Sequence, residues 1–422
     1  MLNRTLIPDL KPIQKIHFIE PERIPLGGIA EIFHLDKVPD ETVRIELYFQ
    51  AGQIHGKKNM SSFVSSLLLS GTKDKTSFQI HEELDELGAY FQNEVSTEMA
   101  FVNLFCLRKN AQKAFEILLD AIQNVQFFEH EISDILQEKK QRFLVSNEKV
   151  SYLARRAFQK HIFHSSENYA RQIELSDFES IKRQDLVEFH ENYYLKGLKE
   201  VVVVGNLEKE FISFLKDNLS VMTLQNYFSY ESQLKSNSGE FHIPKKGALQ
   251  TAIRVGIPLF NKKNPDFFSF QVLQTILGDY FGSRLMSNIR EDKGYTYGIA
   301  CSLVELKETG YFVIATEVGS QFIHATLKEI KFEIERLKQE LVSKEELDLV
   351  RNYLLGQLLK NADGPNAMMD LFLSVQQHNL TLDFYNDFIE KLKSITVEEV
   401  KNMANKYLDW SKFTIVTAGE HN

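Results

Sequence analysis

The residues best suited to metal or acid–base chemistry in this 422-residue chain are a few histidines with acidic neighbours. His161 and His164 have the i, i+3 spacing that places two imidazoles on one face of a helix. No cysteine or acid accompanies them at a metal-binding spacing, and His81 and His130 stand beside glutamates and aspartates. Because surface histidines of this kind ordinarily only titrate, we expect no metal site at any of them.

Other patterns that would carry catalysis are missing from the sequence. It contains no GxSxG elbow, no Ser-His-Asp context and no GxxxxGK[ST] phosphate loop. The two cysteines, Cys106 and Cys301, form no CxxC pair and lie in apolar runs, which predicts small core residues. An independent hydrolase with a site of its own is therefore the weakest interpretation.

Charge and hydropathy narrow the choice of partners and location. Lys and Arg number 49 and Asp and Glu 58, for a net charge of -9 without a basic block, so nucleic acid is a poor partner. Residues 1–15 lack the apolar core of a signal peptide, and no apolar run approaches the ~20 residues that span a bilayer. We expect a cytoplasmic protein without a membrane span.

The elements that must position any site occur twice along the chain. A helical run over residues 180–193 leads to a strand at 201–204, and a similar run over 394–407 leads to a strand at 415–418. The two runs begin 214 residues apart (394 − 180 = 214), and they end 214 residues apart (407 − 193 = 214). A constant offset across helix, turn and strand indicates an internal duplication.

Elements further upstream repeat with small shifts. The strand-like segment 101–107 resembles 311–318, and each precedes a long amphipathic helix, at 112–126 and 322–339. These helices follow strands in groups rather than alternating regularly with them, which favours an α+β fold over a doubly wound parallel sheet.

The connector between the two halves is legible in the composition. Residues 223–244 are rich in Ser, Asn, Gln and Lys without sustained periodicity, so we expect domains at 1–222 and 245–422 joined by this linker. The run Val43–Phe49 alternates apolar and polar residues, which predicts a strand whose sheet has one covered face. The expected fold is therefore two homologous α/β-sandwich domains arranged like a clam-shell.

Three segments give the chain a family resemblance. They are Ala51-Gly52 followed by residues 59–72 (NMSSFVSSLLLSGT), residues 135–138 with Glu131 before them, and residues 282–297 (GSRLMSNIREDKGYTY). Together with the duplication, they resemble the insulinase/pitrilysin metallopeptidases, the inverted zincins, over nearly the whole chain. In active members the first segment reads like GLAHFLEHMLFKGT and contains the zinc motif H-x-x-E-H.

The resemblance implies that the zinc motif has been lost here. Aligned on Gly71-Thr72, the two zinc-binding histidines of the family fall at Ser62 and Ser66, and its catalytic glutamate falls at Ser65. A serine hydroxyl is a poor zinc ligand and a poor general base near neutral pH.

The third zinc ligand of the family, a downstream glutamate, is matched by Glu138, and Glu131 matches a supporting acid. One carboxylate does not hold zinc. We therefore expect no metal or other cofactor in this chain, and we interpret Glu138 as a relic, with solvated helix charge as the plainer interpretation of both glutamates.

The C-terminal segment keeps its match to the family. Active members carry R-E-x-[RK]-G-x-x-Y, whose arginine and tyrosine reach across from the second domain to the substrate carbonyl; Arg290, Glu291, Lys293, Gly294 and Tyr297 match it. A developing oxyanion needs a fixed donor and a positive charge, which a tyrosine hydroxyl and a guanidinium supply. The plainer alternative is a surface ion pair at Arg290 and a half-buried strand at Tyr297.

Some members of this family work as pairs of chains, one with H-x-x-E-H and one contributing the arginine and tyrosine. The resemblance therefore implies a non-catalytic subunit that binds peptide and brings Arg290 and Tyr297 in trans to the zinc site of a homologous partner. In that heterodimer the zinc belongs to the partner. The alternative is a homodimeric peptide-binding or assembly protein with no enzymatic role.

Overall fold

Each half of the chain contributes one β-sheet. The computed structural model describes residues 13–224, 228–232 and 234–420; residues 1–12, most of the segment inspected for a signal peptide, lie outside it. The first sheet has the strand order β1-β2-β6-β3-β5-β4, and the second has the order β7-β11-β8-β10-β9. The strands are β1 (Glu22–Gly27), β2 (Ala30–Leu35), β3 (Thr42–Phe49), β4 (Tyr90–Val95), β5 (Ala100–Leu107), β6 (Leu198–Val204), β7 (Gly239–Pro244), β8 (Gln250–Leu259), β9 (Thr296–Glu305), β10 (Gly310–Gly319) and β11 (Thr414–Gly419).

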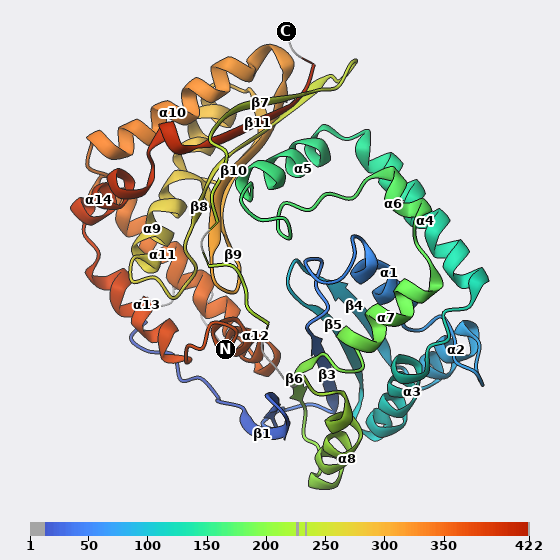
Figure 1. Ribbon diagram of the computed structural model, residues 1–422. Helices are drawn as coiled ribbons and strands as arrows, with labels where there is room; N and C mark the ends of the chain where they lie inside the picture. The colour runs from blue at the N-terminus through green and yellow to red at the C-terminus, as the bar shows by residue number, and fades with distance from the viewer. Residues whose placement is uncertain (1–12, 225–227, 233, 421–422) are drawn as a thin grey trace, which may run out of the picture.

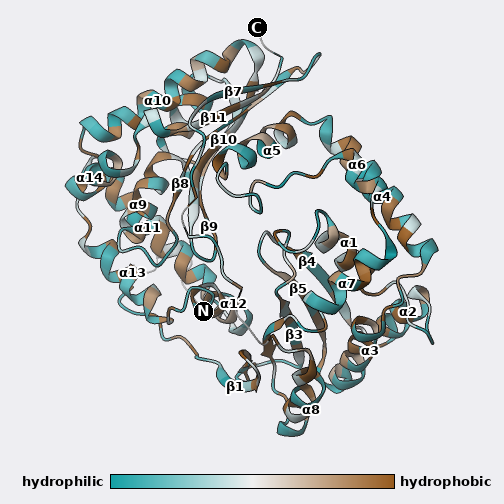
Figure 2. Cartoon of the chain, in the orientation of Figure 1, coloured by the Kyte–Doolittle hydropathy of each residue, from teal (hydrophilic) through white to brown (hydrophobic). Residues whose placement is uncertain are grey.

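The helices of each half pack mainly on one face of its own sheet, with α5 (Val150–Ile162) and α12 (Pro365–Gln376) as exceptions. In the first half they are α1 (Met60–Leu67), α2 (Ser77–Glu86), α3 (Ala111–Asn124), α4 (Glu129–Asn147), α5 (Val150–Ile162), α6 (Leu175–Glu179), α7 (Arg183–Tyr193) and α8 (Lys209–Leu219). In the second half they are α9 (Phe267–Gly278), a π-helix (Met286–Asp292), α10 (Ile323–Gln339), α11 (Lys344–Asn361), α12 (Pro365–Gln376), α13 (Asp383–Ser394) and α14 (Val397–Tyr407). Hydrophobic residues gather on the strands and on the helix sides that face them (Figure 2), as expected for a buried core.

The two sheets have the same topology once β1 is set aside. In each, the first strand pairs in parallel with the last one in sequence, β2 with β6 and β7 with β11, and the other pairings are antiparallel. The helices α7 and α14 begin 214 residues apart (397 − 183 = 214). The predicted duplication and the α/β-sandwich fold are confirmed, and the halves face each other across a central space (Figure 1).

The halves exchange a helix with each other. α5 of the first half packs on β8 and β11 of the second sheet, and α12 of the second half packs on β6 of the first (Figure 1). Gly256 in β8 makes the first contact possible, because a Cβ there would lie 2.7 Å from the ring of Phe158. On the other side, the rings of Phe33 and Phe372 meet edge to face with centroids 5.0 Å apart. The exchange ties the halves together through both sheets.

The exchanged helix explains where strand β3 departs from the sequence pattern. Alternation predicted one covered face, but every residue of β3 except Thr42 is buried. The polar face is covered because α12 lies over it: Arg44 contacts Glu46 at 2.5 Å and Asp370 of α12 at 2.7 Å. These charges are therefore paired inside the contact between the halves.

Three further predictions concern the linker, the two cysteines and a membrane span. Residues 239–244, which fall in the expected linker, form β7 and pair with β11. Cys106 and Cys301 are both buried and unbridged, as predicted. Across the described residues, no helix is long and apolar enough to cross a membrane.

Candidate functional site

The helix that would carry the zinc motif, α1, is held by its apolar side. Phe63, Val64 and Leu67 are buried in the first-half core, and the helix packs against α4, α7 and β4. The three serines differ in exposure: Ser65 is buried, Ser62 is half-buried and Ser66 is exposed. Their hydroxyls do not replace the imidazole and carboxylate groups that zinc prefers.

Lys139 contacts one of the serines aligned with the zinc motif, Ser62. Lys139 of α4 donates a hydrogen bond from Nζ to Ser62 Oγ at 2.8 Å, and its ammonium lies 5.5 Å from the centroid of the Phe63 ring. Burial lowers the pKa of Lys139 to about 8, and the charge of Arg142 acts in the same direction. A cation here repels Zn²⁺, and among the described residues no three His, Cys, Asp or Glu side chains gather to hold a metal. The residues present do not fit zinc.

The two glutamates matched to the family lie elsewhere on α4. Glu138 is exposed and forms an i, i+4 ion pair with Arg142, and Glu131 lies half-exposed with His130 Nε2 at 3.7 Å. Because neighbouring residues on a helix point about 100° apart, the structure brings Lys139 rather than Glu138 to Ser62. The sequence shows the Glu-Lys-Lys run at residues 138–140, but it does not show which of these side chains faces α1.

The histidines weighed as metal ligands also have structural explanations. The His161 ring stacks on Phe241 with centroids 3.6 Å apart, and burial lowers its pKa. His164 and His81 are exposed, and His130 stacks beside Phe128.

The C-terminal segment places Arg290 in an unusual turn of backbone. Residues Met286–Asp292 form a π-helix, a rare widening that recurs at functional sites. The Arg290 guanidinium lies over the ring of Phe281, 4.7 Å from its centroid. In the described part of the chain Arg290 has no carboxylate within ion-pair distance, so the alternative of a surface ion pair does not hold there.

Tyr297 stands in a β-bulge at the start of β9. Ile299 pairs with Thr316 and Thr296 pairs with Val318, so the two residues between them on β9 oppose a single residue of β10. Tyr297 is 91% exposed, so the plainer alternative of a half-buried strand residue does not hold at this position.

Threonine hydroxyls fix the backbone of this bulge. Thr296 Oγ1 donates to the carbonyls of Glu317 at 2.8 Å and Gly298 at 2.9 Å. The Thr316 hydroxyl lies 2.9 Å from both Thr296 Oγ1 and the Gly298 carbonyl. The tyrosine is thus an exposed phenol on a rigid base, and sequence reasoning had not recognised the threonines that hold it.

Two cavities lie along the inner faces. One of about 550 Å³ runs between the halves, from Ser61 and Ser62 across to Leu306 and Tyr311 of the second half. A second, of about 380 Å³, holds Tyr297. Within the described residues no hydrogen bond or ion pair joins the three serines to Arg290 or Tyr297. Of the matched residues, Ser62 lines the first cavity and Tyr297 the second, and the structure does not assemble them into one catalytic centre.

A polar contact between two hairpin turns closes one side of the larger cavity. The backbone N–H of Lys307, in the β9–β10 turn, donates to both oxygens of Glu98, in the β4–β5 turn, at 2.9 and 3.2 Å. The Tyr169 hydroxyl donates to the same carboxylate at 2.6 Å. Burial raises the pKa of Glu98. The two halves therefore meet through their hairpin tips as well as through their exchanged helices.

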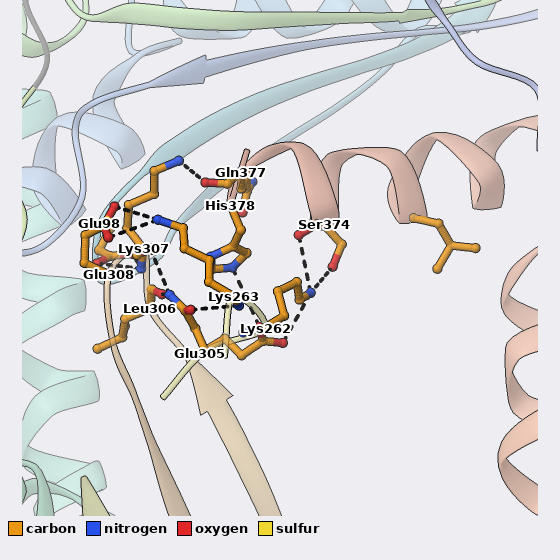
Figure 3. A network of polar contacts seen from close by, with 12 residues as sticks. Glu98, Lys262, Lys263, Glu305, Leu306, Lys307, Glu308, Ser374, Gln377 and His378 are labelled. Atoms are coloured by element: carbon orange, nitrogen blue, oxygen red, sulfur yellow. Dashed lines mark hydrogen bonds and ion pairs between the residues drawn. The ribbon is translucent and has the colours of Figure 1, made fainter. Parts of the chain in front are cut away.

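The contact extends to the end of α12 (Figure 3). Lys262 donates to Ser374 Oγ at 2.7 Å and lies 3.3 Å from Glu305, while Lys307 Nζ donates to the Gln377 carbonyl. Burial, with the nearby Lys262 charge, lowers the pKa of His378 to about 3. No sequence pattern indicated this network, because its members come from separate loops.

Comparison with known sequences agrees with the fold. The family model described as Insulinase (Peptidase family M16) matches residues 32–169, and the model described as Peptidase M16 inactive domain matches residues 180–354. The two-sheet duplicated architecture and these matches define a metallopeptidase-like protein whose zinc motif is replaced. The chain belongs to the peptidase M16 family.

Its relatives include proteins named as peptidases and as non-peptidases. A Rickettsia felis protein named an uncharacterized zinc protease is 26% identical over 326 residues, covering 76% of this chain and 78% of that protein. A Helicobacter pylori protein named non-peptidase homolog YmxG is 20% identical over 382 residues, covering 88% and 87%. A crystal structure of a peptidase M16 inactive domain from Pseudomonas fluorescens, 23% identical, covers 96% of this chain and 99% of that chain with a TM-score of 0.86.

Proposed function

We propose that this chain is the non-catalytic subunit of a two-chain zinc peptidase. It would bind a peptide between its halves and contribute Arg290 and Tyr297 to the zinc site of an H-x-x-E-H partner. The observation that carries the proposal is the contrast between a lysine bonded to Ser62 in the lost zinc motif and a tyrosine left 91% exposed on a fixed bulge.

The strand edges support peptide binding. β4 and β9 are the terminal strands of the two sheets, and each pairs with one neighbour among the described residues. An extended peptide adds to such an edge through main-chain hydrogen bonds. On β9, Gly298, Ala300 and Ser302 are exposed, so small side chains leave room for a bound strand beside Tyr297.

The chemical role follows from the two retained side chains. The Tyr297 hydroxyl can donate a hydrogen bond to an oxygen that gains negative charge, and the Arg290 guanidinium adds a positive charge and a fork of donors. Neither group abstracts a proton or activates water, so both need a partner that supplies the zinc and the general base. This division of labour is why the proposal requires two chains.

The test is to reconstitute the complex with an H-x-x-E-H homologue of similar length. Complex formation is followed by size-exclusion chromatography, and peptidase activity is measured with wild-type chain, with R290A and with Y297F. We expect both variants to form the complex and to reduce kcat by about 10²–10³. Unchanged kcat in both variants would contradict the role in trans. A chain that forms homodimers and ignores the homologue would instead favour a peptide-binding or assembly protein without an enzymatic role.

A further inference from the structure

The larger cavity between the halves has a one-sided charge. The chain has more acidic than basic residues, 58 against 49. Yet the cavity is lined by Arg155, Arg156 and Arg171 and by no aspartate or glutamate. Its other polar lining is neutral: glutamine, asparagine, serine, threonine and tyrosine side chains. The lining therefore carries a net positive charge, whereas the whole chain carries a net negative one.

The three arginines differ in how far their charge is neutralised. Arg156 is paired with Glu174 at 3.0 Å and also donates to Asn147 and Gln172. Arg171 donates to a neutral acceptor on each side, the Gly56 carbonyl at 2.8 Å and Asn168 Oδ1 at 2.9 Å.

Arg155 is exposed, with its guanidinium 5.4 Å from the centroid of the Tyr152 ring. In the described part of the chain neither Arg155 nor Arg171 has a carboxylate within ion-pair distance. Two of the three positive charges are thus available to a ligand.

A fourth arginine extends this surface onto the second sheet. Arg254 of β8 lines the neighbouring cavity together with Tyr297 and Glu317. Burial lowers the pKa of Arg254, and the charge of Arg155 lowers it further while Glu317 opposes the effect. Glu317 is the acid that faces this group, and among the described residues it forms no ion pair with Arg254. Arginine side chains therefore line both cavities, from α5 across to β8, and Glu317 is the one acid in the two linings.

The geometry points to a carboxylate-bearing peptide as the ligand of this surface. Arginine presents a planar fork of donors that matches a carboxylate, and unpaired guanidinium groups in a cavity gain most from an anion that replaces water. We propose that Arg155, Arg171 and Arg254 form an anion subsite that selects acidic peptides for binding between the halves. This inference rests on the proposed function and names its substrate class.

The experiment measures binding to the full chain alone, so that it does not depend on a partner or on activity. Fluorescence anisotropy is recorded with a labelled ten-residue peptide containing three glutamates. A second peptide replaces each glutamate by glutamine, and both are made with a free carboxyl terminus and with an amidated one. These arms separate acidic side chains from the terminal carboxylate as the source of the charge.

We expect the glutamate peptide to bind about 10-fold or more tightly than its glutamine counterpart, with affinity falling as salt rises. R155Q and R254Q should each remove much of that difference. K113Q is the matched control: Lys113 is exposed on α3, and the substitution makes the same change in net charge.

Each outcome decides one point. If affinity follows the free terminus rather than the glutamates, the subsite reads a chain end and the selection of acidic side chains is overturned. Equal binding of all four peptides overturns the anion subsite while leaving the reconstitution test of the proposed function intact. Weakening by K113Q as large as by R155Q would reduce the effect to net charge and also overturn it. If the chain binds acidic peptides selectively but gives no peptidase activity when mixed with the H-x-x-E-H homologue, the partner role is rejected and the anion subsite is not.

Discussion

Two regions of this molecule, the α1 serines and the segment from Arg290 to Tyr297, hold their polar side chains in opposite ways. At α1 the serines are partly buried, and the Lys139 ammonium donates a hydrogen bond to Ser62. At β9 the polar side chain remains outside the core, on a bulge fixed by Thr296 and Thr316. The polar side chains of α1 have packing partners, whereas the Tyr297 side chain is open to a ligand.

The structural support differs in the same sense. Helix α1 is covered by α4 and α7, so most of its side chains pack in the core. Tyr297 belongs to a terminal strand that faces a cavity, and its backbone is specified while its side chain is free. Rigid backbone with an unburied functional group is typical of preorganised binding sites.

The largest effect is expected where a helix of the first half packs on the second sheet. α5 lines the cavity next to Ser62 and buries Phe158 against the second sheet, near Gly256. F158A should lower the free energy of unfolding by about 3–5 kcal/mol, because it leaves a cavity in a buried contact. Urea unfolding followed by circular dichroism measures it. F372A on the exchanged helix α12 is the matched variant, and a much smaller loss in either would indicate that the halves are held mainly by other contacts.

A pH effect is expected beneath the α1 region. His190 of α7 is buried and its Nε2 donates to the Ile122 carbonyl at 2.8 Å; burial lowers its pKa to about 4 from 6.5. Between pH 6.5 and 4 the unfolded chain binds a proton that the folded chain does not, so stability falls as pH falls. The loss from this residue is at most about 3 kcal/mol.

Urea midpoints measured across this pH range test the expectation. H190Q should flatten the decline, whatever its effect on stability at pH 7, while H81Q at an exposed position should leave the slope unchanged. An equally steep decline in H190Q would place the sensitivity elsewhere, for example at His378, whose pKa is also lowered by burial.

Restoring ligands should separate the loss of the serines from the effect of the lysine. S62H/S66H supplies two imidazoles, and S62H/S66H/K139E adds a carboxylate and removes the cation bonded to position 62. We expect the triple variant to bind zinc at least about 10-fold more tightly than the double variant. Competition with a colorimetric zinc chelator measures this difference. Equal affinities would mean that Lys139 does not define the altered site.

The smallest effect is expected from an exposed residue of the lost motif. S66A removes a hydroxyl that no longer serves a metal, so peptidase activity of the reconstituted complex should stay within about 2-fold of wild type. Y297F is the comparison, with its expected large loss. A loss in S66A comparable to that in Y297F would show that the α1 region still takes part in catalysis.

Much of the fold was legible in the sequence because it is carried by local patterns repeated at a fixed offset. The helix and strand pairs at 183–204 and 397–419 were predicted from their periodicity and spacing. The exchange of α5 and α12 was not, because an amphipathic helix reveals that it has a buried face but not which sheet covers it.

The site was predicted less completely than the fold. The serine positions and the Arg290–Tyr297 segment followed from family resemblance, and one residue of each set, Ser62 and Tyr297, lines a cavity. Lys139 was missed because one residue of helical phase separates it from Glu138, and the bulge was missed because a strand pattern does not record register. The contact of Glu98 with Lys307 depends on two turns 209 residues apart, beyond the reach of local patterns.

The measurement that tests the central claim most directly is zinc content and peptidase activity on the same samples, for this chain alone and mixed with an H-x-x-E-H homologue. The account predicts no bound zinc and no activity for the chain alone, with activity in the mixture that exceeds that of the homologue by itself. Stoichiometric zinc together with activity in this chain alone would contradict it.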